Sequence, residues 1–423
     1  GGNGGSGGQI TMNAGSSITL AGSLYAQGGQ GGAGGVGGDG YYSGGSGGYG
    51  GSGGWGGSVY LNGASIAQTG SIDTRGGQGG KGGNGVNGYY YGGDGGNGGA
   101  GGGGSSGYGG AVTLRATSGA ISVSGDILAS GGVGGGGGQG GNATYGGYGG
   151  WGGLGGAGGS GTGGVVIHAA TNVTLKGILA KGGLGGAGGV AGSGGYGGSV
   201  AGASGYGGVA GSVDVTADTG NITLNSGSSL SAADITLKSV TFTNNASSNV
   251  LSAENRWLVY SNAPLGDVFG GLMSGHAAVW NNGAPGLGNY FVFAIQPQVV
   301  ITSTDLSKIY GTDATTAVAG AYTIAGLNGG YTGSAFTPDT LSGIPAVTST
   351  GSPVSALVAG SPYVIDVASG TLGSLPSGYR PLALQSTGLL TVTDVSVIPP
   401  VIPPVIPPEI PPEIPPEIPP EIP

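Results

Sequence analysis

The sequence predicts an all-β protein whose first half is a right-handed parallel β-helix, a solenoid, interrupted by glycine-rich hairpin insertions. Two observations point to this fold. Gly-Gly-X triplets fill four long stretches before residue 211, and short β-branched segments recur between them about every 50 residues. Glycine supplies 113 of the 423 residues, yet no proline occurs before Pro264. Repetition at a long fixed period is typical of solenoids, in which each unit buries its core by stacking on the next.

The β-branched segments are predicted to form the coils of the solenoid. Their strand starts, which are 49, 53, 53 and 48 residues apart, are Ile10, Val59, Val112, Val165 and Val213. Each segment holds two or three runs in which apolar and small polar residues alternate, a pattern typical of strands with one buried face. We therefore expect about 20 residues in each coil, made of three short strands, and about 30 in each insertion.

Each insertion is predicted to be a hairpin of two polyglycine-II-like arms. The triplets break near the middle of the first three insertions, at residues 41–43, 86–91 and 142–144, and the fourth is less regular at 190–191 and 199–204. An arm of roughly 12 residues would be about 37 Å long. Neighbouring arms would satisfy each other's backbone groups. Flexible loops are the alternative. The regular triplets and the aromatic residues at X positions favour order; these are Tyr49, Trp55, Tyr108, Tyr148, Trp151 and Tyr196.

The second half of the chain has a different composition, and four domains are predicted in all. Residues 1–240 are the β-helix with its four insertions, and 241–297 form a connector. Residues 298–396 contain five or six strand-like runs bounded by Gly, Pro, Ser and Asp, which predict a small β-sandwich. Residues 397–423 repeat Ile-Pro-Pro-Val and Ile-Pro-Pro-Glu, which predicts a stiff polyproline-II tail acting as a tether.

Two stretches of this second half resemble a known family. Residues 256–261 (RWLVYS), 270–272 (GGL) and 288–291 (GNYF) are similar to the segment that closes the β-helix of filamentous-haemagglutinin-like exoproteins. Residues 308–311 (KIYG) and 388–392 (GLLTV) resemble the MBG or YGX-type repeat module that follows such helices. The resemblance implies a surface adhesin of a Gram-negative bacterium, exported by an outer-membrane partner of the two-partner secretion pathway. The long glycine-rich hairpins and the single module depart from the family pattern.

Composition argues against catalysis and against several kinds of partner. Only 6% of residues are charged, and residues 1–212 carry five cations and four anions, so we expect neither nucleic acid nor anionic lipid to bind. The chain has no cysteine and no long apolar run, which argues against thiolate chemistry and membrane insertion. His168 and His276 have no catalytic partner nearby in the sequence, and the calcium-type nonapeptide around Asp39 occurs once. No enzyme activity, cofactor or metal site is therefore predicted.

Tyrosines at the hairpin tips are the candidate binding residues. They are Tyr41, Tyr42, Tyr89, Tyr90, Tyr91 and Tyr145. Such rings either stack on a ligand or clamp neighbouring hairpins together. The predicted function is an adhesin stalk that makes multivalent contacts in cell adhesion or biofilm, with glycans, other surface proteins or itself as partners. The alternative is a self-associating filament of the extracellular matrix, in which the hairpins are assembly elements.

Overall fold

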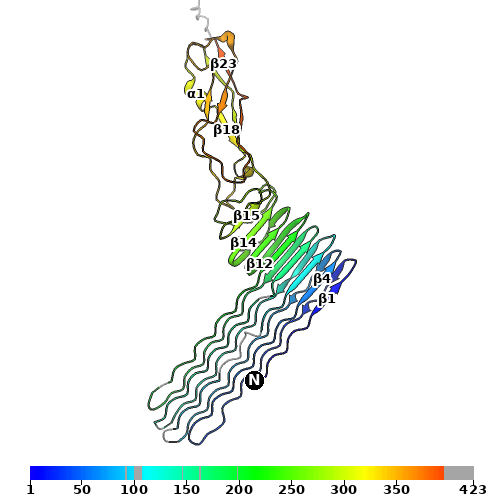
Figure 1. The fold of residues 1–423 in the computed structure, drawn as a ribbon, viewed down its shortest axis with the longest axis vertical. Helices are drawn as coiled ribbons and strands as arrows, with labels where there is room; N and C mark the ends of the chain where they lie inside the picture. Colours follow the sequence, from blue (N-terminus) through cyan, green and yellow to red (C-terminus); the bar gives the residue numbers. More distant parts are fainter. Residues whose placement is uncertain (91–92, 100–106, 145, 162, 198, 395–423) are drawn as a thin grey trace, which may run out of the picture. The chain divides into compact units, whose positions relative to one another are not determined.

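A large parallel sheet dominates the structure. The computed structural model describes residues 1–90, 93–99, 107–144, 146–161, 163–197 and 199–394. Within them, 15 strands form one sheet, and the single α-helix, α1 (Thr315–Ala319), has five residues (Figure 1). The prediction of an all-β protein is confirmed, and the large parallel sheet is compatible with the predicted β-helix.

The chain divides into two compact units. The first comprises Gly1–Ile301, Ile324–Ile344 and Ser369–Leu384, and the second comprises Thr302–Thr323, Pro345–Ala368 and Gln385–Pro423. The chain passes between them five times, first within β16 (Val300–Ser303) and then within β18 (Tyr322–Ala325), and later after residues 344, 368 and 384. The predicted proline-rich tail, 397–423, lies outside the described residues.

Three ladders of parallel strands build the first unit. The first ladder contains β1 (Ile10–Asn13), β4 (Val59–Gly63), β7 (Val112–Ala116), β9 (Val165–Ala169), β11 (Val213–Ala217), the end of β12 (Asn221–Lys238), β14 (Leu251–Ser261) and β15 (Tyr290–Phe293). The second contains β2 (Ile18–Leu20), β5 (Ile66–Gln68), β8 (Ile121–Leu128), β10 (Val173–Leu179), β12 and β13 (Thr241–Asn244). The third joins β3 (Leu24–Tyr25) and β6 (Ile72–Asp73) to the later residues of β8, β10 and β12 and to the start of β14.

Identical register in successive repeats stacks apolar side chains into buried columns. The first ladder aligns Ile10, Val59, Val112, Val165, Val213, Ile235 and Trp257. The second aligns Ile18, Ile66, Ile121, Val173, Ile222 and Phe242. From Val59 to Trp257 and from Ile18 to Phe242 these residues are buried, because every second side chain of a strand points to the same face. Each repeat thus contributes to a continuous core that it could not bury alone.

Glycine-rich hairpins connect the third ladder of one repeat to the first ladder of the next. We call residues 28–40, 76–88, 131–143 and 182–194 the outgoing arms. The described parts of the return arms are residues 44–57, 93–99 with 107–110, 147–161 with 163–164, and 199–211, and residues 1–8 run as a further return arm. In Figure 1 the arms lie side by side and leave the strands in the same direction.

Backbone hydrogen bonds organise the arms into two layers, one of outgoing and one of return arms. The first glycine of a triplet donates its N–H within its layer, to the X-residue carbonyl of the next arm. Gly134 N lies 2.9 Å from Leu184 O, and Gly155 N lies 2.8 Å from Ala203 O. The second glycine donates across the layers, as Gly153 N does to Gly138 O at 2.9 Å. Two of the three N–H groups of a triplet are thereby satisfied inside the array.

The second unit is built from short strands around a small core. It contains β17 (Leu306–Ile309), β19 (Ala346–Thr348), β20 (Tyr363–Val364), β21 (Asp366–Ala368) and β23 (Leu389–Thr393). β17 pairs with β23 in parallel, whereas β20 with β23 and β19 with β21 are antiparallel. The buried side chains are Ala314, Val318, Ala321, Val347, Ile365 and Leu390. The 3₁₀ segment Val358–Gly360 also belongs to this unit, whereas the 3₁₀ segment Leu327–Gly330 belongs to the first unit and β22 (Ala383–Gln385) spans the boundary between the two.

Candidate functional site

Inside the array, side chains of the hairpins are confined to the X positions, because neither glycine of a triplet has room for a Cβ there. Among the described residues the first outgoing arm has no outgoing arm before it, and a Cβ on its second glycines Gly35 and Gly38 would meet nothing within 4 Å. A Cβ on Gly134, a first glycine, would lie 2.0 Å from Gly156 O in the opposite layer. One on Gly135, a second glycine, would lie 1.9 Å from Gly80 O of the preceding arm. At the X position, Gly136, the nearest atom would be Ala187 O at 3.7 Å. Every functional group of the array therefore projects from its outer surface.

The two layers present different chemistry on that surface. The outgoing arms carry mainly amide and aliphatic residues at X, including Gln30, Val36, Gln78, Asn84, Asn87, Val133, Gln139, Asn142, Leu184 and Val190. The return arms carry the aromatic residues: Tyr49, Trp55, Tyr108, Tyr148, Trp151 and Tyr206. We call these six residues the aromatic face.

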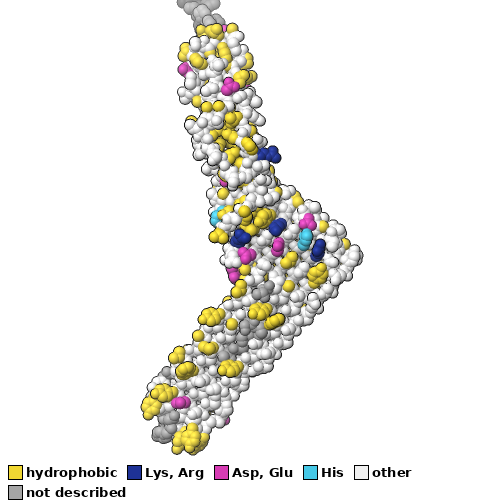
Figure 2. Space-filling model, in the orientation of Figure 1, with side chains coloured by type: hydrophobic (Ala, Val, Ile, Leu, Met, Phe, Trp, Pro, Cys, Tyr) yellow, Lys and Arg dark blue, Asp and Glu magenta, His cyan; other side chains and the backbone are white. Residues whose placement is uncertain are grey.

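Five of the six rings of the aromatic face are exposed, and Tyr108 is half-buried. Tyr49 is 75% exposed, Trp151 64% and Tyr206 88%, and Trp55 and Tyr148 are also exposed. Trp55 and Tyr108 occupy equivalent positions in adjacent return arms and contact edge to face, with ring centroids 5.7 Å apart. Figure 2 shows apolar side chains spaced along the arms with few charged ones between them. Large exposed rings on a near-neutral surface favour contact with a neutral partner.

The third N–H of a triplet, that of the X residue, is satisfied where the neighbouring arm has asparagine or aspartate at its X position. The Oδ1 atoms of Asn97 and Asp94 accept from the backbone N–H groups of Trp151 and Tyr148, each at 2.9 Å. In the outgoing layer, Asn84 accepts from Gln139 N at 3.0 Å. These bonds hold the backbone beneath two rings of the aromatic face, so an amide in one arm positions an aromatic residue in the next.

The tip tyrosines predicted as binding residues come together across two hairpins. The rings of Tyr41, Tyr42 and Tyr90 pack against one another with all three centroid separations at 5.2 Å. Tyr41, Tyr42, Tyr89 and Tyr90 nevertheless remain exposed. Asp39, Gly40, Tyr41, Tyr89 and Tyr90 line an open hollow of about 620 Å³. Tyr91 and Tyr145 lie outside the described residues.

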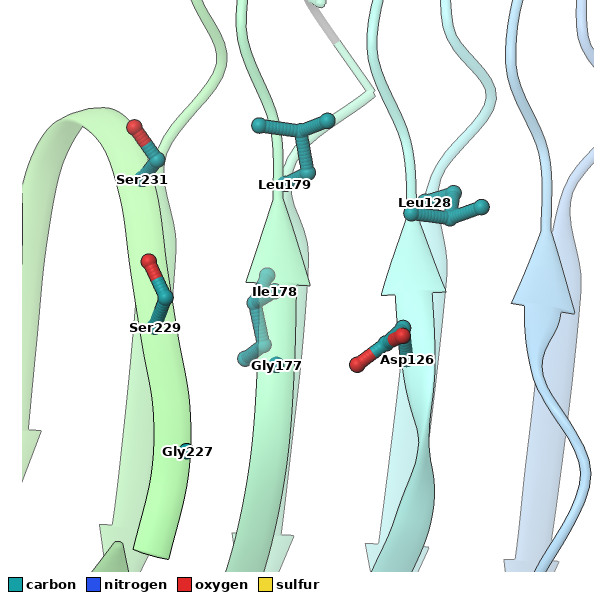
Figure 3. A pocket seen from close by; sticks show the side chains of 8 residues that line it. All are labelled: Asp126, Leu128, Gly177, Ile178, Leu179, Gly227, Ser229 and Ser231. Carbon is teal, nitrogen blue, oxygen red and sulfur yellow. The ribbon is translucent and has the colours of Figure 1, made fainter. Parts of the chain in front are cut away.

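Two further hollows of the first unit contain titratable side chains. Asp126, Gly177 and Ser229 line one of about 170 Å³ on the outer side of β8, β10 and β12, where glycines leave a gap (Figure 3). The Asp126 carboxylate lies 3.5 Å from Lys176 Nζ. A second, of about 520 Å³, contains His276, whose ring stacks on Tyr290 and whose Nδ1 lies 3.0 Å from Asn289 O.

His168 pairs with a carboxylate, whereas the Nδ1 atom of His276 lies beside backbone carbonyls. His168 Nε2 lies 2.9 Å from both carboxylate oxygens of Asp218, on the exposed surface of adjacent repeats. Among the described residues, no three His, Cys, Asp or Glu side chains are placed to hold a metal ion. A search of the same residues found no helix with the length and apolarity to cross a membrane.

The sequence pointed to the tips but missed the aromatic face as a surface. The signal was available: once each insertion is divided into two arms, every aromatic X residue of the described arms falls in a return arm. Tyr206 was not predicted to be at an X position, because the fourth hairpin departs from the Gly-Gly-X pattern around it. In comparisons with known proteins, no family model, no curated protein and no solved structure matched the chain.

Proposed function

We propose that the chain is part of a secreted bacterial surface adhesin, which binds its partners through many weak contacts made by the glycine-rich hairpins. The stalk would be a right-handed β-helix and the arms polyglycine-II helices. A β-sandwich module and a polyproline-II tether would follow. Export by a two-partner secretion pathway to the surface of a Gram-negative bacterium is the part of this proposal that rests on the family resemblance.

The aromatic face is the observation that carries the proposal. Successive X positions lie about 9 Å apart along an arm with a rise of 3.1 Å per residue, and rings occupy two successive X positions at Tyr148 and Trp151 and alternate ones at Tyr49 and Trp55. The first three return arms are held on both sides by hydrogen bonds, so their rings lose little further freedom when a partner binds. Each contact is weak, but several rings that bind one long partner raise the overall affinity without any new kind of contact.

Replacing rings of the aromatic face tests the proposal. Beads coated with residues 1–423 would be allowed to settle on Gram-negative cells and on cellulose or chitin particles, both neutral polysaccharides. The test variant is Tyr49→Ser, Tyr148→Ser and Trp151→Ser. The matched control, Val36→Ser, Val133→Ser and Val190→Ser, removes apolar residues from the outgoing layer. We expect the test variant to lose attachment and the control to keep it, with unchanged melting temperatures. Equal attachment of both variants would refute the proposal.

The tyrosine tips need a separate variant, because their rings contact both solvent and one another. Replacing Tyr41, Tyr42, Tyr89 and Tyr90 with serine removes the described tip cluster. Lost attachment at an unchanged melting temperature would assign the tips to binding. A lowered melting temperature with attachment retained would assign them to clamping the first two hairpins together.

A self-associating matrix filament is the second candidate function. The observation that favours it is a row of backbone N–H groups on the fourth hairpin that have no backbone acceptor among the described residues, including those of Gly185, Gly188, Ala201 and Ser204. Unpaired backbone edges can pair with another chain. Electron microscopy at increasing concentration, beside a variant without the four hairpins, decides between the two functions. Laterally bundled filaments formed only by the intact chain would support the filament.

A further inference from the structure

The fourth return arm departs from the triplet rule at its first positions. Two hydrogen bonds align this arm with the third return arm: Gly152 N donates to Val200 O, and Gly155 N donates to Ala203 O. In this alignment Ala201 is equivalent to Gly152, and Ser204 is equivalent to Gly155. First positions are glycine throughout residues 44–57 and 149–161. The second glycines of the fourth return arm, Gly202, Gly205 and Gly208, are kept.

The reason for this departure is that, among the described residues, no arm lies beyond the fourth return arm. A Cβ on Gly152 would lie 2.0 Å from Gly189 O of the fourth outgoing arm, and one on Gly155 would lie 1.9 Å from Gly186 O. At Gly207, by contrast, the nearest atom to an added Cβ is a carbonyl oxygen at 3.7 Å. The repeats that follow carry no insertion, since β12 runs directly from the second ladder to the first. Ala201 and Ser204 are accordingly exposed.

We propose that the fourth return arm is a stop, in which Ala201 and Ser204 prevent a glycine-rich arm of a second copy of this chain from adding to the array. The open N–H groups of Gly185 and Gly188 match the acceptors that such an arm offers, because equivalent groups inside the array bond to another arm. An arm added at the next position of the array would place carbonyl oxygens about 2 Å from the Cβ atoms of Ala201 and Ser204. This is the separation found for a Cβ added at the equivalent glycines, Gly152 and Gly155. The N–H groups of the edge thus stay hydrated, because the side chains of Ala201 and Ser204 sterically exclude an arm that would otherwise bond to them.

Removal of the two side chains tests the stop, independently of the adhesin proposal. The filament alternative, which needs this edge to pair in the wild type, predicts the opposite result for the wild type. The test variant is Ala201→Gly with Ser204→Gly. The matched control, Ala187→Gly with Ala203→Gly, introduces two glycines at exposed X positions of the same hairpin. Sedimentation velocity over a wide concentration range would measure the weight-average mass. We expect wild type and control to stay at 39.5 kDa and the test variant to approach or exceed twice that mass. Adding Gly207→Ala to the test variant should weaken its association and so place the contact on this edge.

Two results would overturn the proposal. One is a folded test variant that sediments as wild type at every concentration, and the other is a wild type that associates as strongly as the variant. Circular dichroism would establish folding. If the test variant does not fold, residues 182–211 can be replaced by the corner that joins the rungs of β12, residues 231–234. That deletion leaves the third hairpin as the edge, whose return arm has glycine at every first position of residues 149–161, and a monomeric product would equally refute the stop.

Discussion

Room for a single Cβ decides which residues the hairpins accept. Inside the array, both glycines of a triplet face a carbonyl oxygen about 2 Å from where a Cβ would stand, whereas the X position faces outward. The backbone at Gly135 and Gly136 is not left-handed, so conformational preference does not explain the glycines there. The Gly-Gly-X pattern is thus a packing rule between arms.

Alanine substitutions at two neighbouring glycines should therefore have opposite effects. Gly135→Ala places its methyl group 1.9 Å from Gly80 O, and we expect it to lower the free energy of unfolding by about 2–3 kcal/mol or more. Gly136→Ala meets nothing nearer than 3.7 Å, and it should stabilise the protein by about 0.4–1 kcal/mol because it restricts the unfolded chain. Denaturant unfolding of the two variants measures both effects, and equal effects would show that the arms are not packed.

Asp267 makes the stability of the first unit depend on pH. Burial raises the pKa of its carboxyl group to about 6, although Ser261 Oγ and Phe242 N donate hydrogen bonds to it at 2.5 Å and 2.8 Å. A pKa that is higher in the folded state favours folding while the group is protonated. This contribution is complete below pH 3.8 and is lost as the pH rises through 6.

Asp267→Asn keeps both hydrogen-bonding partners and removes the ionisation. We expect the variant to be more stable than wild type by about 2 kcal/mol at pH 8, with the difference shrinking towards pH 4. Thermal unfolding of the two proteins across this pH range measures the difference in stability. The contributions of the other carboxylates cancel in this difference, because both proteins contain them. A difference that does not vary with pH would contradict the prediction.

At the scale of elements, the sequence located the strands well because their spacing and alternation are local signals. The predicted starts Ile10, Val59, Val112, Val165 and Val213 are paired with one another in the first ladder. Val213 pairs with Ile235, so a repeat without an insertion has 22 residues (235 − 213), close to the expected 20. The two layers of arms were not predictable from this spacing, because which arm bonds to which depends on contacts between residues about 50 apart.

Hydrogen exchange should reveal the layers as an alternation between neighbouring amides. In the fourth outgoing arm, Gly186 N donates to Gly156 O at 2.8 Å, whereas Gly185 N has no backbone acceptor among the described residues. We expect Gly186 to exchange at least about tenfold more slowly than Gly185, since an opening free energy of about 1.4 kcal/mol suffices. Residue-resolved exchange by NMR measures both amides. Fast exchange at both would favour the flexible-loop alternative for these insertions.

The candidate site was harder to predict than the strands. Tyr41, Tyr42, Tyr89 and Tyr90 stand out in the sequence because they cluster, and the structure brings three of their rings together. The aromatic face was missed because its rings are isolated along the chain. They share a surface only after the triplet period and the layer of each arm are combined, and the second of these is a property of the folded array.

At the scale of the whole molecule, the chain holds two compact units with cores of very different size. All four tryptophans, Trp55, Trp151, Trp257 and Trp280, lie in the first unit, so tryptophan fluorescence reports on that unit alone. The small core of the second unit is supplemented by Lys308. In the sequence Lys308 stood out only as the first residue of the motif at 308–311, whereas the structure shows that its side chain is buried.

The ammonium group of Lys308 joins two loops of the second unit, and its removal should affect that unit alone. Nζ donates to Thr312 O and Ser352 O, each at 3.1 Å, and to Pro353 O. Lys308→Met leaves these carbonyls without their donor, and we expect it to destabilise the second unit by about 2–4 kcal/mol. Exchange at the buried β23 residues Leu390 and Val392 should accelerate, while the tryptophan-detected transition stays unchanged. Ser307→Met, at an exposed position of the same strand, is the control. A shift of the tryptophan transition by Lys308→Met would show instead that the two units unfold together.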